Sequence, residues 1–492
     1  MPPMKLAIIG GGPSAFYVAS RLLSLVKADS TNPPLRIHMF DRLWAPHGLV
    51  RYGVAPDHPE VKASNCTHKF DTAAADPRLK FFGNVNIGSS STPSPIPHTL
   101  NLSLTSILTN YTHLLFATGC TLPTLHPFLP PSPYCLPALS LVHWYTQHPS
   151  APPPPPLERT THISLIGNGN VSLDVARMLL TPPSVLEKYD VPRPVLDVLN
   201  RSQVRHVSIF GRRGPLEAAF TAKELRELTN LPDAAMVPIR EDVLDVKETT
   251  RQQGRILQLL RKGSKNMFGM TQKTWSLDFY RSPMGLVLPD EERGMAKLSL
   301  AHTKVDQETG RAVPTGETEE VETSLVVTSL GFRSEPSAPF YDSDLEHLRT
   351  MPGGRVIDVG DGNKEVKNVY ASGWAATGAK GVLAATMMNA YGVADAILSD
   401  WLPGYQEVHT AMTPEGAGTD NVNLSQQREV MNPKPDLENV PAEVQDGLKD
   451  GVVTQYEDWK KVNEEEIRRG EGCAKERERM GWEEARVFLK RI

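Results

Sequence analysis

Cysteine is scarce in this sequence, and no two cysteines are closely spaced. The 492 residues contain four of them, Cys66, Cys120, Cys135 and Cys473, and no Cys-x-x-Cys motif. That motif is typical of zinc knuckles and of the reactive dithiol in disulfide reductases. Its absence argues against both classes, so we expect no metal site. Unpaired cysteines also favour a reducing compartment.

Long apolar runs and a positive net charge are also missing. No run approaches the roughly 18 apolar residues that suggest a membrane-spanning helix, so we expect no transmembrane segment. The formal net charge of -5 predicts no general attraction to nucleic acid, and any positive docking surface must be local. An expected strand begins almost at Met4, which leaves no room for a signal or transit peptide. The chain is therefore cytoplasmic unless it lacks a leader.

The N-terminal segment "LAIIGGGPSAFYVASRLL" has the pattern of a nucleotide-binding turn. Gly10, Gly12 and Ala15 fit G-x-G-x-x-G/A, between an apolar strand and a helix. The glycines allow a tight turn and bring a pyrophosphate close to the free N–H groups of the helix. The next expected strand, "LRIHMFD", ends in Asp41, an acid that can bind ribose hydroxyls. This context predicts a dinucleotide site.

A second turn of this kind lies in "LIGNGNVSLD", residues 165–174. It keeps Gly167 and Gly169 but has Ser172 at the third glycine position. The following strand ends in "GRRG" instead of an acid. Arg212 and Arg213 would pair with a 2′-phosphate, which selects NADPH over NADH. One turn is therefore expected to hold a flavin nucleotide and the other a nicotinamide nucleotide.

The rest of the chain adds strands, two loops and a charged tail. Buried strands are expected in "SLVVTSLGF" (324–332) and "NVYASGW" (368–374). The prolines at 152–156 predict an extended surface insertion beside a domain junction. Residues 410–450 are polar and are expected to form a loop, followed by charged amphipathic helices.

Taken together, these stretches resemble the adrenodoxin reductase family of NADPH–ferredoxin reductases, which has fungal and bacterial relatives. The segments that carry the resemblance are "HGLVRYGVAPDHPEVK" (47–62), "GNGNVSLDVARMLLTPP" (167–183), "GRRGPLEAAFTAKELREL" (211–228), "FYRSP" (279–283), "RAVPTG" (311–316) and "SGWAATGAKGVLAATM" (372–387). The resemblance implies an α/β fold with two Rossmann-like dinucleotide-binding domains. The FAD domain would be discontinuous, formed by residues 1–120 and 336–492, with the NADPH domain of residues 121–335 inserted between them.

The resemblance also implies the residues that contact each cofactor. FAD would contact Gly10, Gly12, Ser14, Asp41, Leu49, Ile87, Trp374, Gly381, Val382 and Leu383. NADPH would contact Asn168, Gly169, Asn170, Val171, Arg212, Arg213, Glu224 and Gly381. The sequence departs from the family in having Ser14-Ala15 in place of Ala-Gly and Asp41 in place of Glu. Both changes preserve the turn and the ribose contact.

Two ionisable residues are candidates for handling a proton beside the flavin. His58 lies in the loop "APDHPE", and Asp174 lies one turn into the second nucleotide-binding helix. The resemblance implies that they approach each other across the domain junction. The alternative is local: a hydrogen-bonding loop histidine and a carboxylate that stabilises the helix dipole.

The family's ferredoxin partners are acidic, so a net-acidic reductase must gather positive charge locally. Arg226, Arg251 and Arg255 match the family's docking positions, and the last two are spaced to share one helix face. Lys262 and Lys265 could extend this patch. Solvated surface charge is the alternative interpretation.

The expected function is a flavoprotein reductase that passes electrons from NADPH through FAD to an iron–sulfur ferredoxin. By resemblance we expect a monomer of the mitochondrial matrix, with peripheral association with the inner membrane. Two alternatives stay open. One is an NADPH flavin reductase module like the small subunit of glutamate synthase, although its cysteine-rich N-terminal region is missing. The other is a noncatalytic nucleotide-sensing protein on the same fold.

Overall fold

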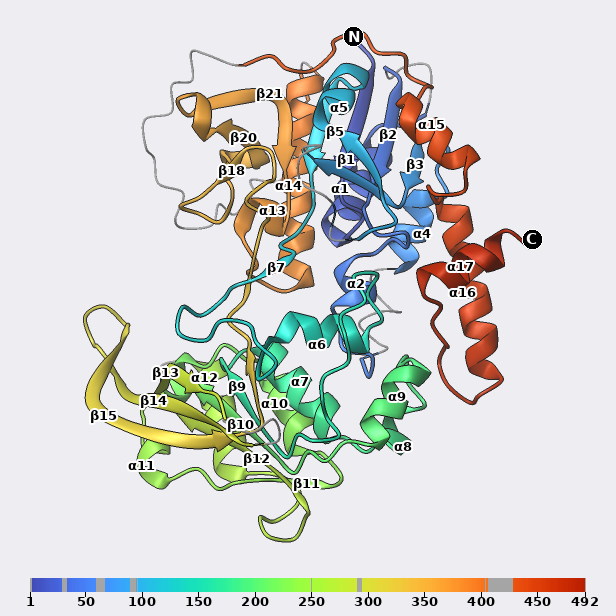
Figure 1. Cartoon of the computed structure of the whole chain (residues 1–492). Coiled ribbons are helices and arrows are strands. Elements are labelled where there is room, and N and C mark those ends of the chain that lie inside the picture. Colours follow the sequence, from blue (N-terminus) through green and yellow to red (C-terminus); the bar gives the residue numbers. More distant parts are fainter. Residues whose placement is uncertain are drawn as a thin grey trace.

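The computed structural model describes residues 2–28, 33–58, 67–88, 94, 96–248, 250–289, 294–402, 404–405 and 428–491. The chain forms two bodies, each built on a six-stranded sheet (Figure 1). We call them the N-terminal body and the inserted body. Parts of two predicted segments, residues 59–62 and 410–427, lie outside the described residues.

The sheet of the N-terminal body has the strand order β20-β21-β6-β1-β2-β3. Its strands are β1 (Met4–Ile9), β2 (Leu35–Phe40), β3 (Leu79–Phe82), β6 (His113–Phe116), β20 (Arg355–Asp358) and β21 (Lys364–Ala371). All neighbours are parallel except β20 and β21. The chain leaves β1 for β2 on one side and later adds β6 on the other. This reversal places the carboxyl end of β1 at the crevice where open α/β sheets bind ligands.

The sheet of the inserted body repeats this plan, with the order β11-β12-β10-β9-β16-β8 and parallel pairing throughout. Its strands are β8 (Cys135–Pro137), β9 (His162–Ile166), β10 (His206–Gly211), β11 (Ala234–Met236), β12 (Lys273–Phe279) and β16 (Leu325–Thr328). A three-stranded antiparallel sheet adjoins it, formed by β13 (Arg281–Val287), β14 (Ala296–Val305) and β15 (Ala312–Thr323). The corresponding crevice lies at the carboxyl end of β9.

Helices cover these sheets and connect their strands. In the N-terminal body these are α1 (Pro13–Leu25), α2 (Leu49–Tyr52), α4 (His68–Ala74), α5 (Leu104–Asn110), α13 (Trp374–Thr377) and α14 (Leu383–Trp401). In the inserted body they are α6 (Ala138–Tyr145), α7 (Asn170–Leu180), α8 (Pro183–Leu186), α9 (Arg193–Asn200), α10 (Ala222–Thr229), α11 (Glu241–Leu244) and α12 (Arg251–Lys262). Short strand pairs complete the chain: β4 (Val85–Gly88) with β5 (Leu100–Ser103), and β18 (Tyr341–Asp342) with β19 (His347–Leu348).

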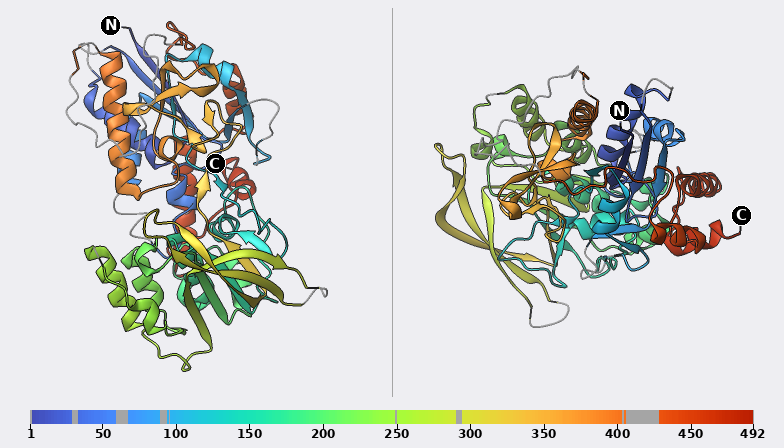
Figure 2. Two further views of the ribbon diagram at one scale, coloured as in Figure 1. Left: turned by 90° about the vertical axis from the view of Figure 1, so that its left-hand side faces the viewer. Right: turned by 90° about the horizontal axis from the view of Figure 1, so that it is seen from above.

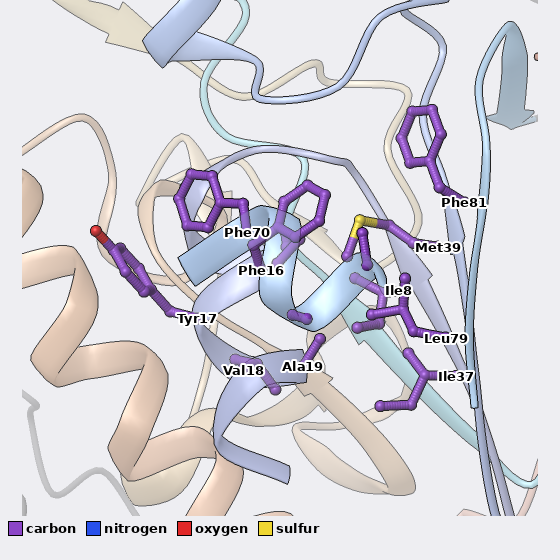
Figure 3. Close-up of a cluster of buried hydrophobic side chains, with 14 of the residues drawn as sticks. Ile8, Phe16, Tyr17, Val18, Ala19, Ile37, Met39, Phe70, Leu79 and Phe81 are labelled. Atoms are coloured by element: carbon purple, nitrogen blue, oxygen red, sulfur yellow. The ribbon is translucent and has the colours of Figure 1, made fainter. Parts of the chain in front are cut away.

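The core of the N-terminal body packs α1 and α4 against the sheet (Figure 3). Phe16 of α1 and Phe70 of α4 stack with their ring centroids 4.9 Å apart. Ile8, Ile37 and Phe81 of the sheet belong to the same buried cluster. Burial of apolar side chains contributes about 25 cal/mol per Å² of surface removed from water. This packing holds the start of α1 in position at the end of β1.

The chain passes between the two bodies at two points that lie side by side. Strand β7 (Leu122–Pro123), on the way out, pairs antiparallel with β17 (Phe332–Arg333), on the way back. The N-terminal body is therefore discontinuous, and the other body is an insertion within it. The predicted fold class, two Rossmann-like α/β domains with one inserted in the other, is confirmed.

The C-terminal region contains more helix than the sequence predicted. Residues expected to be a loop include helix α15 (Ala442–Lys449), so that part of the prediction was wrong. Its Val444 and Gly447 are buried against β5 and the 451–453 turn. These tertiary contacts stabilise the helix, and the polar composition of the segment does not indicate them. The expected helices in the charged tail are present as α16 (Tyr456–Glu471) and α17 (Trp482–Leu489).

The segment 466–479 joins the two bodies, and we call it the C-terminal strap. At one end Glu466 forms a buried ion pair with Arg51 of the N-terminal body at 2.8 Å. At the other end Arg479 pairs with buried Asp190 of the inserted body at 2.5 Å and donates to the Thr146 carbonyl. Removing one partner of a buried pair typically costs about 3–5 kcal/mol. The strap therefore restrains the relative position of the two crevices.

Candidate cofactor and electron-transfer site

The first glycine turn connects β1 directly to α1. Gly10 has a φ of +109°, and a Cβ atom there would lie 2.3 Å from the Ala117 carbonyl oxygen. Only glycine tolerates both the backbone angle and this close approach. Gly12 precedes α1, and a Cβ at that position would meet nothing within 4 Å. Open space thus lies in front of the first N–H groups of α1, as a bound phosphate requires.

Asp41 follows β2 and lies directly beside this turn. Its carboxylate accepts hydrogen bonds from the Gly11 N–H at 2.6 Å and the Leu43 N–H at 2.9 Å. Burial raises the pKa of Asp41 to about 6, although these two donors oppose the rise. The carboxylate is thus oriented by the turn itself.

Other predicted FAD residues surround the same turn. The Ser14 hydroxyl donates to Ser372 Oγ at 2.7 Å, which joins α1 to the end of β21. Trp374 begins α13, two residues later, and its indole N–H donates to the Lys380 carbonyl. Leu49 begins α2 and is partly exposed. Ile87 lies on β4, where the nearby Val85 N–H donates to the Asp41 carbonyl.

The predicted residues at 381–383 form the beginning of helix α14. Val382 is its N-cap, and no side chain caps it, so its first N–H groups are free to meet an acceptor. Helix α14 packs along α1. Among the described contacts, none connects Gly381 with the second glycine turn, so its double role remains a prediction.

The second glycine turn repeats the geometry of the first. Gly167 has a φ of +115°, and its Cβ would lie 2.3 Å from the Ser329 carbonyl oxygen. Gly169 precedes α7 and faces open space, followed by Asn170 and Val171 in the first turn of the helix. Asn170 accepts a hydrogen bond from the Thr221 N–H at 2.8 Å, and Thr221 also contacts Glu224. This brings the start of α10 to the second crevice.

The groups that follow β10 are cationic. Arg212 is exposed and Arg213 is half-buried, and in the described part of the chain neither guanidinium has a hydrogen bond or ion pair. Gly211 lies so close to Asn168 that a Cβ would be 2.6 Å from its side-chain nitrogen. That nitrogen is buried and has no partner among the described residues. An unpartnered amide and two available arginines fit a phosphorylated ribose.

His58 and Asp174 lie in one charged cluster at the junction of the two bodies. His58 Nε2 is 2.5 Å from Glu227 Oε2 of α10. Arg177 of α7 lies between the other groups: its guanidinium is 2.7 Å from Asp57, 2.8 Å from Asp174 and 3.2 Å from Glu227. The histidine thus contacts Glu227 directly, whereas Asp174 interacts with it through Arg177.

The charges in this cluster shift one another's proton affinity. Burial alone would lower the pKa of His58, but the hydrogen bond to Glu227 and the nearby Asp57 and Asp174 raise it. Burial raises the pKa of Asp174 against the opposing effect of Arg177. Burial would also raise the pKa of Glu227, yet its hydrogen bond to His58 keeps it low. The cluster therefore favours a protonated histidine next to a carboxylate.

The three predicted docking arginines lie together at a cavity of about 560 Å³ between α10 and α12. Its lining consists of Thr221, Ala222, Lys223, Arg226, Arg251, Gln252 and Arg255. Arg251 and Arg255 share a face of α12, as their spacing predicted. We call this feature the arginine cavity.

Comparison with known proteins identifies the family. No protein-family model matches the chain. Human mitochondrial NADPH:adrenodoxin oxidoreductase is 33% identical over 494 residues, which span 97% of this chain and 90% of the human protein. NADPH-ferredoxin reductase FprA of Mycobacterium tuberculosis is 33% identical over 419 residues, 81% of this chain and 84% of that protein. A solved structure of FprA in complex with NADPH superposes with a TM-score of 0.79 at 28% identity, covering 99% of both chains.

The chain belongs to the NADPH:adrenodoxin oxidoreductase family. The resemblance drawn from the sequence is therefore confirmed. Family membership also decides between the sequence-based interpretations, because it favours a ferredoxin-type oxidoreductase over a module of glutamate synthase. No helix in the described ranges is both long and apolar enough to cross a membrane.

Three residues of the charged cluster around His58 were not predicted from the sequence of this NADPH:adrenodoxin oxidoreductase family member. Asp57, Arg177 and Glu227 complete the cluster around His58. Glu227 lies within a segment that carried the resemblance, and its position on one helix could be predicted. Its proximity to a histidine 169 residues earlier could not, because that contact forms only when the two bodies meet.

The two lysines predicted to extend the arginine patch lie beyond the lining of the cavity. Lys262 ends α12 seven residues after Arg255, a rise of roughly 10 Å along the helix. Residues seven apart lie on the same face of a helix, and Lys265 follows three residues later. Their part in the patch therefore stays a prediction.

Proposed function

We propose that this protein passes electrons from NADPH through FAD to an acidic iron–sulfur ferredoxin. The observation that carries the proposal is the pair of matching glycine turns, which differ in the residue after the next strand. Asp41 follows β2, the strand after the first turn, and Arg212 follows β10, the strand after the second turn. An acid suits the ribose of FAD, and an arginine suits the 2′-phosphate of NADPH.

FAD would be held at the first turn. The free N–H groups at the start of α1 face open space for the pyrophosphate, and Asp41 would accept from a ribose hydroxyl. Trp374 and the start of α14 would bound the flavin end, with the helix N-terminus stabilising negative charge there. When bound, FAD accepts two electrons together and releases them one at a time.

NADPH would be held at the second turn, with its pyrophosphate at the start of α7. Arg212 and Arg213 would bind the 2′-phosphate, because neither has another described partner. Asn168 would use its unpartnered amide, and Glu224 would lie at the edge of the site through Thr221. The roles of all these residues belong to the proposal.

His58 would hold a proton at the junction of the two sites. Its Nε2 is anchored by Glu227, and Arg177 fixes Asp57 and Asp174 around it. Hydride transfer itself requires no acid or base, so this cluster would position groups and balance charge. Loss of His58 should slow turnover without abolishing it.

The arginine cavity would receive the acidic ferredoxin. Arg226, Arg251 and Arg255 converge there on a chain whose net charge is -5. Such local complementarity accelerates association and makes it sensitive to salt. We also propose the domain boundaries 1–120, 121–335 and 336–492, a monomeric state, and a location in the mitochondrial matrix, which the names of the animal relatives support.

The test compares electron delivery to ferredoxin with delivery to a small acceptor. NADPH should bleach the flavin band and drive cytochrome reduction only when a ferredoxin is added. The double variant Arg251→Glu/Arg255→Glu should need at least about tenfold more ferredoxin for half-maximal rate, since several charge-assisted contacts are reversed. Its reduction of ferricyanide should be unchanged.

A matched control is Lys297→Glu/Lys304→Glu, which reverses two exposed charges on β14. It should behave like the unmodified protein in both assays. Equal losses with ferredoxin and ferricyanide would argue against docking at the arginine cavity. A protein without flavin, or one whose flavin NADPH does not bleach, would instead support the noncatalytic alternative.

A further inference from the structure

The loop between α12 and β12 exposes three large apolar side chains. In residues 263–272, Met267 is 78% exposed, Phe268 54% and Met270 79%. We call this segment the Met-Phe-Met loop. It projects from the lower end of the molecule near β11 and β12 (Figures 1 and 2). Single exposed apolar residues are common, but three within four positions at a projecting tip require an explanation.

The exposure does not result from a loose loop, because hydrogen bonds hold its base. The Asn266 side-chain amide donates to the carbonyls of Leu231 and Pro232 at 2.9 and 2.8 Å. The Ser264 hydroxyl accepts from the Met236 N–H at 2.8 Å. The Lys265 N–H donates to the Thr229 carbonyl at 2.8 Å. The base is thus fastened to α10, β11 and the turn between them, and the tip is presented outward.

Two exposed positive charges precede this apolar tip in the chain, at Lys262 and Lys265. Lys273, after the tip, is half-buried: its ammonium group donates to the Leu180 carbonyl at 3.2 Å and interacts with Asp233. Apolar side chains inserted beside lysines match the boundary of an anionic bilayer, where acyl chains lie beneath negative headgroups.

We propose that the Met-Phe-Met loop anchors this protein on the surface of an anionic phospholipid membrane. Met267, Phe268 and Met270 enter the acyl boundary, and Lys262 and Lys265 contact headgroup phosphates. The three apolar side chains lie within four residues of one loop, whereas a standard protein interface buries about 800 Å² on each partner. Insertion into a fluid phase requires no complementary surface, so a small projecting tip suits it.

The position of the loop on α12 is compatible with electron transfer. The arginine cavity is lined by Arg251, Gln252 and Arg255 of this helix, and the loop follows the last residue of α12, roughly 10 Å beyond Arg255 along the axis. A protein anchored by the loop would keep the cavity open to a diffusing ferredoxin. This inference extends the membrane part of the expected function, and its test does not depend on electron transfer.

The test is co-sedimentation of the full chain with vesicles. Vesicles of equimolar phosphatidylcholine and phosphatidylserine should bind the protein, and vesicles of phosphatidylcholine alone should bind it much less. The triple variant Met267→Ser/Phe268→Ser/Met270→Ser should lose about tenfold or more of its binding to the mixed vesicles. Lys262→Gln/Lys265→Gln should lose a smaller part and show weaker dependence on salt.

The matched control replaces three exposed apolar residues on and beside β13, Met284→Ser/Val287→Ser/Leu288→Ser. In the sequence three acids follow them, Asp290, Glu291 and Glu292, which outnumber the two basic residues close by, Arg293 in the sequence and Lys297 opposite Val287 on β14. This control should bind vesicles normally, and ferricyanide reduction should be unchanged in every variant. Equal binding by the loop variant and the unmodified protein would overturn the proposal. So would failure of the unmodified protein to bind, or a concentration-dependent dimer that only the loop variant abolishes.

Discussion

The two glycine turns of this protein have nearly the same backbone but prepare different sites. Gly10 and Gly167 have φ values of +109° and +115°. Each would place a Cβ 2.3 Å from a carbonyl oxygen of the adjoining strand segment, at Ala117 and Ser329. The Gly10 N–H donates to the carbonyl of Phe40, the last residue of β2. The Gly167 N–H donates to the carbonyl of Phe210, the last residue but one of β10. The turns are therefore one structural solution used twice.

The difference between them begins one residue beyond that shared hydrogen bond. After Phe40 comes Asp41, which is buried and bonded to the first turn. After Phe210 comes Gly211, which leaves room for Asn168, followed by two arginines. We therefore expect the backbone to decide where a pyrophosphate binds, and the residues after the second strand to decide which nucleotide is bound.

Adding a methyl group to the first glycine of each turn should have the largest effect. Gly10→Ala and Gly167→Ala force an unfavourable φ and a clash with backbone, at a cost on the order of 3 kcal/mol each. Gly10→Ala should lose FAD, whereas Gly167→Ala should keep FAD and lose reduction by NADPH. Flavin absorbance and thermal melting measure both outcomes.

The control for these variants is Gly285→Ala, which meets nothing within 4 Å and has no positive φ. It should melt and bind flavin like the unmodified protein. Normal flavin occupancy in Gly10→Ala would show that the first turn is not the FAD site.

Filling the open space in front of each helix should remove cofactor without unfolding the protein. A valine at Gly12 or Gly169 meets no protein atom at its Cβ, so stability should fall by less than about 1 kcal/mol. Gly12→Val should purify without FAD, and Gly169→Val should retain FAD but bind NADPH poorly. Equilibrium dialysis with each nucleotide measures the losses, and a Gly169→Val protein that lost only FAD would reverse the assignment.

Removing the arginines after β10 should erase the main chemical difference between the turns. Arg212→Ala/Arg213→Ala deletes charge-assisted contacts worth about 1.5–3 kcal/mol per hydrogen bond. The ratio of kcat/KM for NADPH to that for NADH should fall tenfold or more, as a contact of that strength predicts. The rate with NADH should hardly change. Comparable efficiency with both nucleotides in the unmodified enzyme would contradict the idea.

The smallest expected effect concerns the cluster that joins the two sites. The pKa of His58 is raised from 6.5 and that of Glu227 is lowered from 4.5. The ion pair therefore stabilises the fold most between pH 4.5 and pH 6.5, where the histidine is protonated and the glutamate is ionised. Its contribution disappears as the pH rises through the folded pKa of His58 or falls through that of Glu227. Glu227→Gln should lower the free energy of unfolding by about 1 kcal/mol in that window and less at pH 8.

Urea denaturation at several pH values measures this effect. Glu224→Gln, on the same helix and without contact to His58, should show no such pH dependence. A Glu227→Gln protein whose destabilisation grew above neutral pH would contradict a charged His58–Glu227 pair.

The parts that could be predicted from the sequence depend on short stretches of chain. Each glycine turn directly joins a strand to a helix, so the whole pattern lies within a short stretch of sequence. Asp41 and Arg212 each directly follow a buried strand. Even the shared face of Arg251 and Arg255 follows from helical spacing alone. The helix at 442–449 was missed because its apolar contacts, Val444 among them, are with β5, more than 300 residues away in the chain.

The sequence by itself determined that this chain has two nucleotide-binding turns and that their following residues differ in charge. Local spacing and side-chain chemistry suffice for that. Only the tertiary structure decided that His58 meets Glu227, that Arg479 of the strap pairs with Asp190, and that Ser264 and Asn266 hold the base of the Met-Phe-Met loop. These contacts join residues from different elements, and most join the two bodies. Because such proximity depends on the packing of whole domains, no pattern along the chain records it.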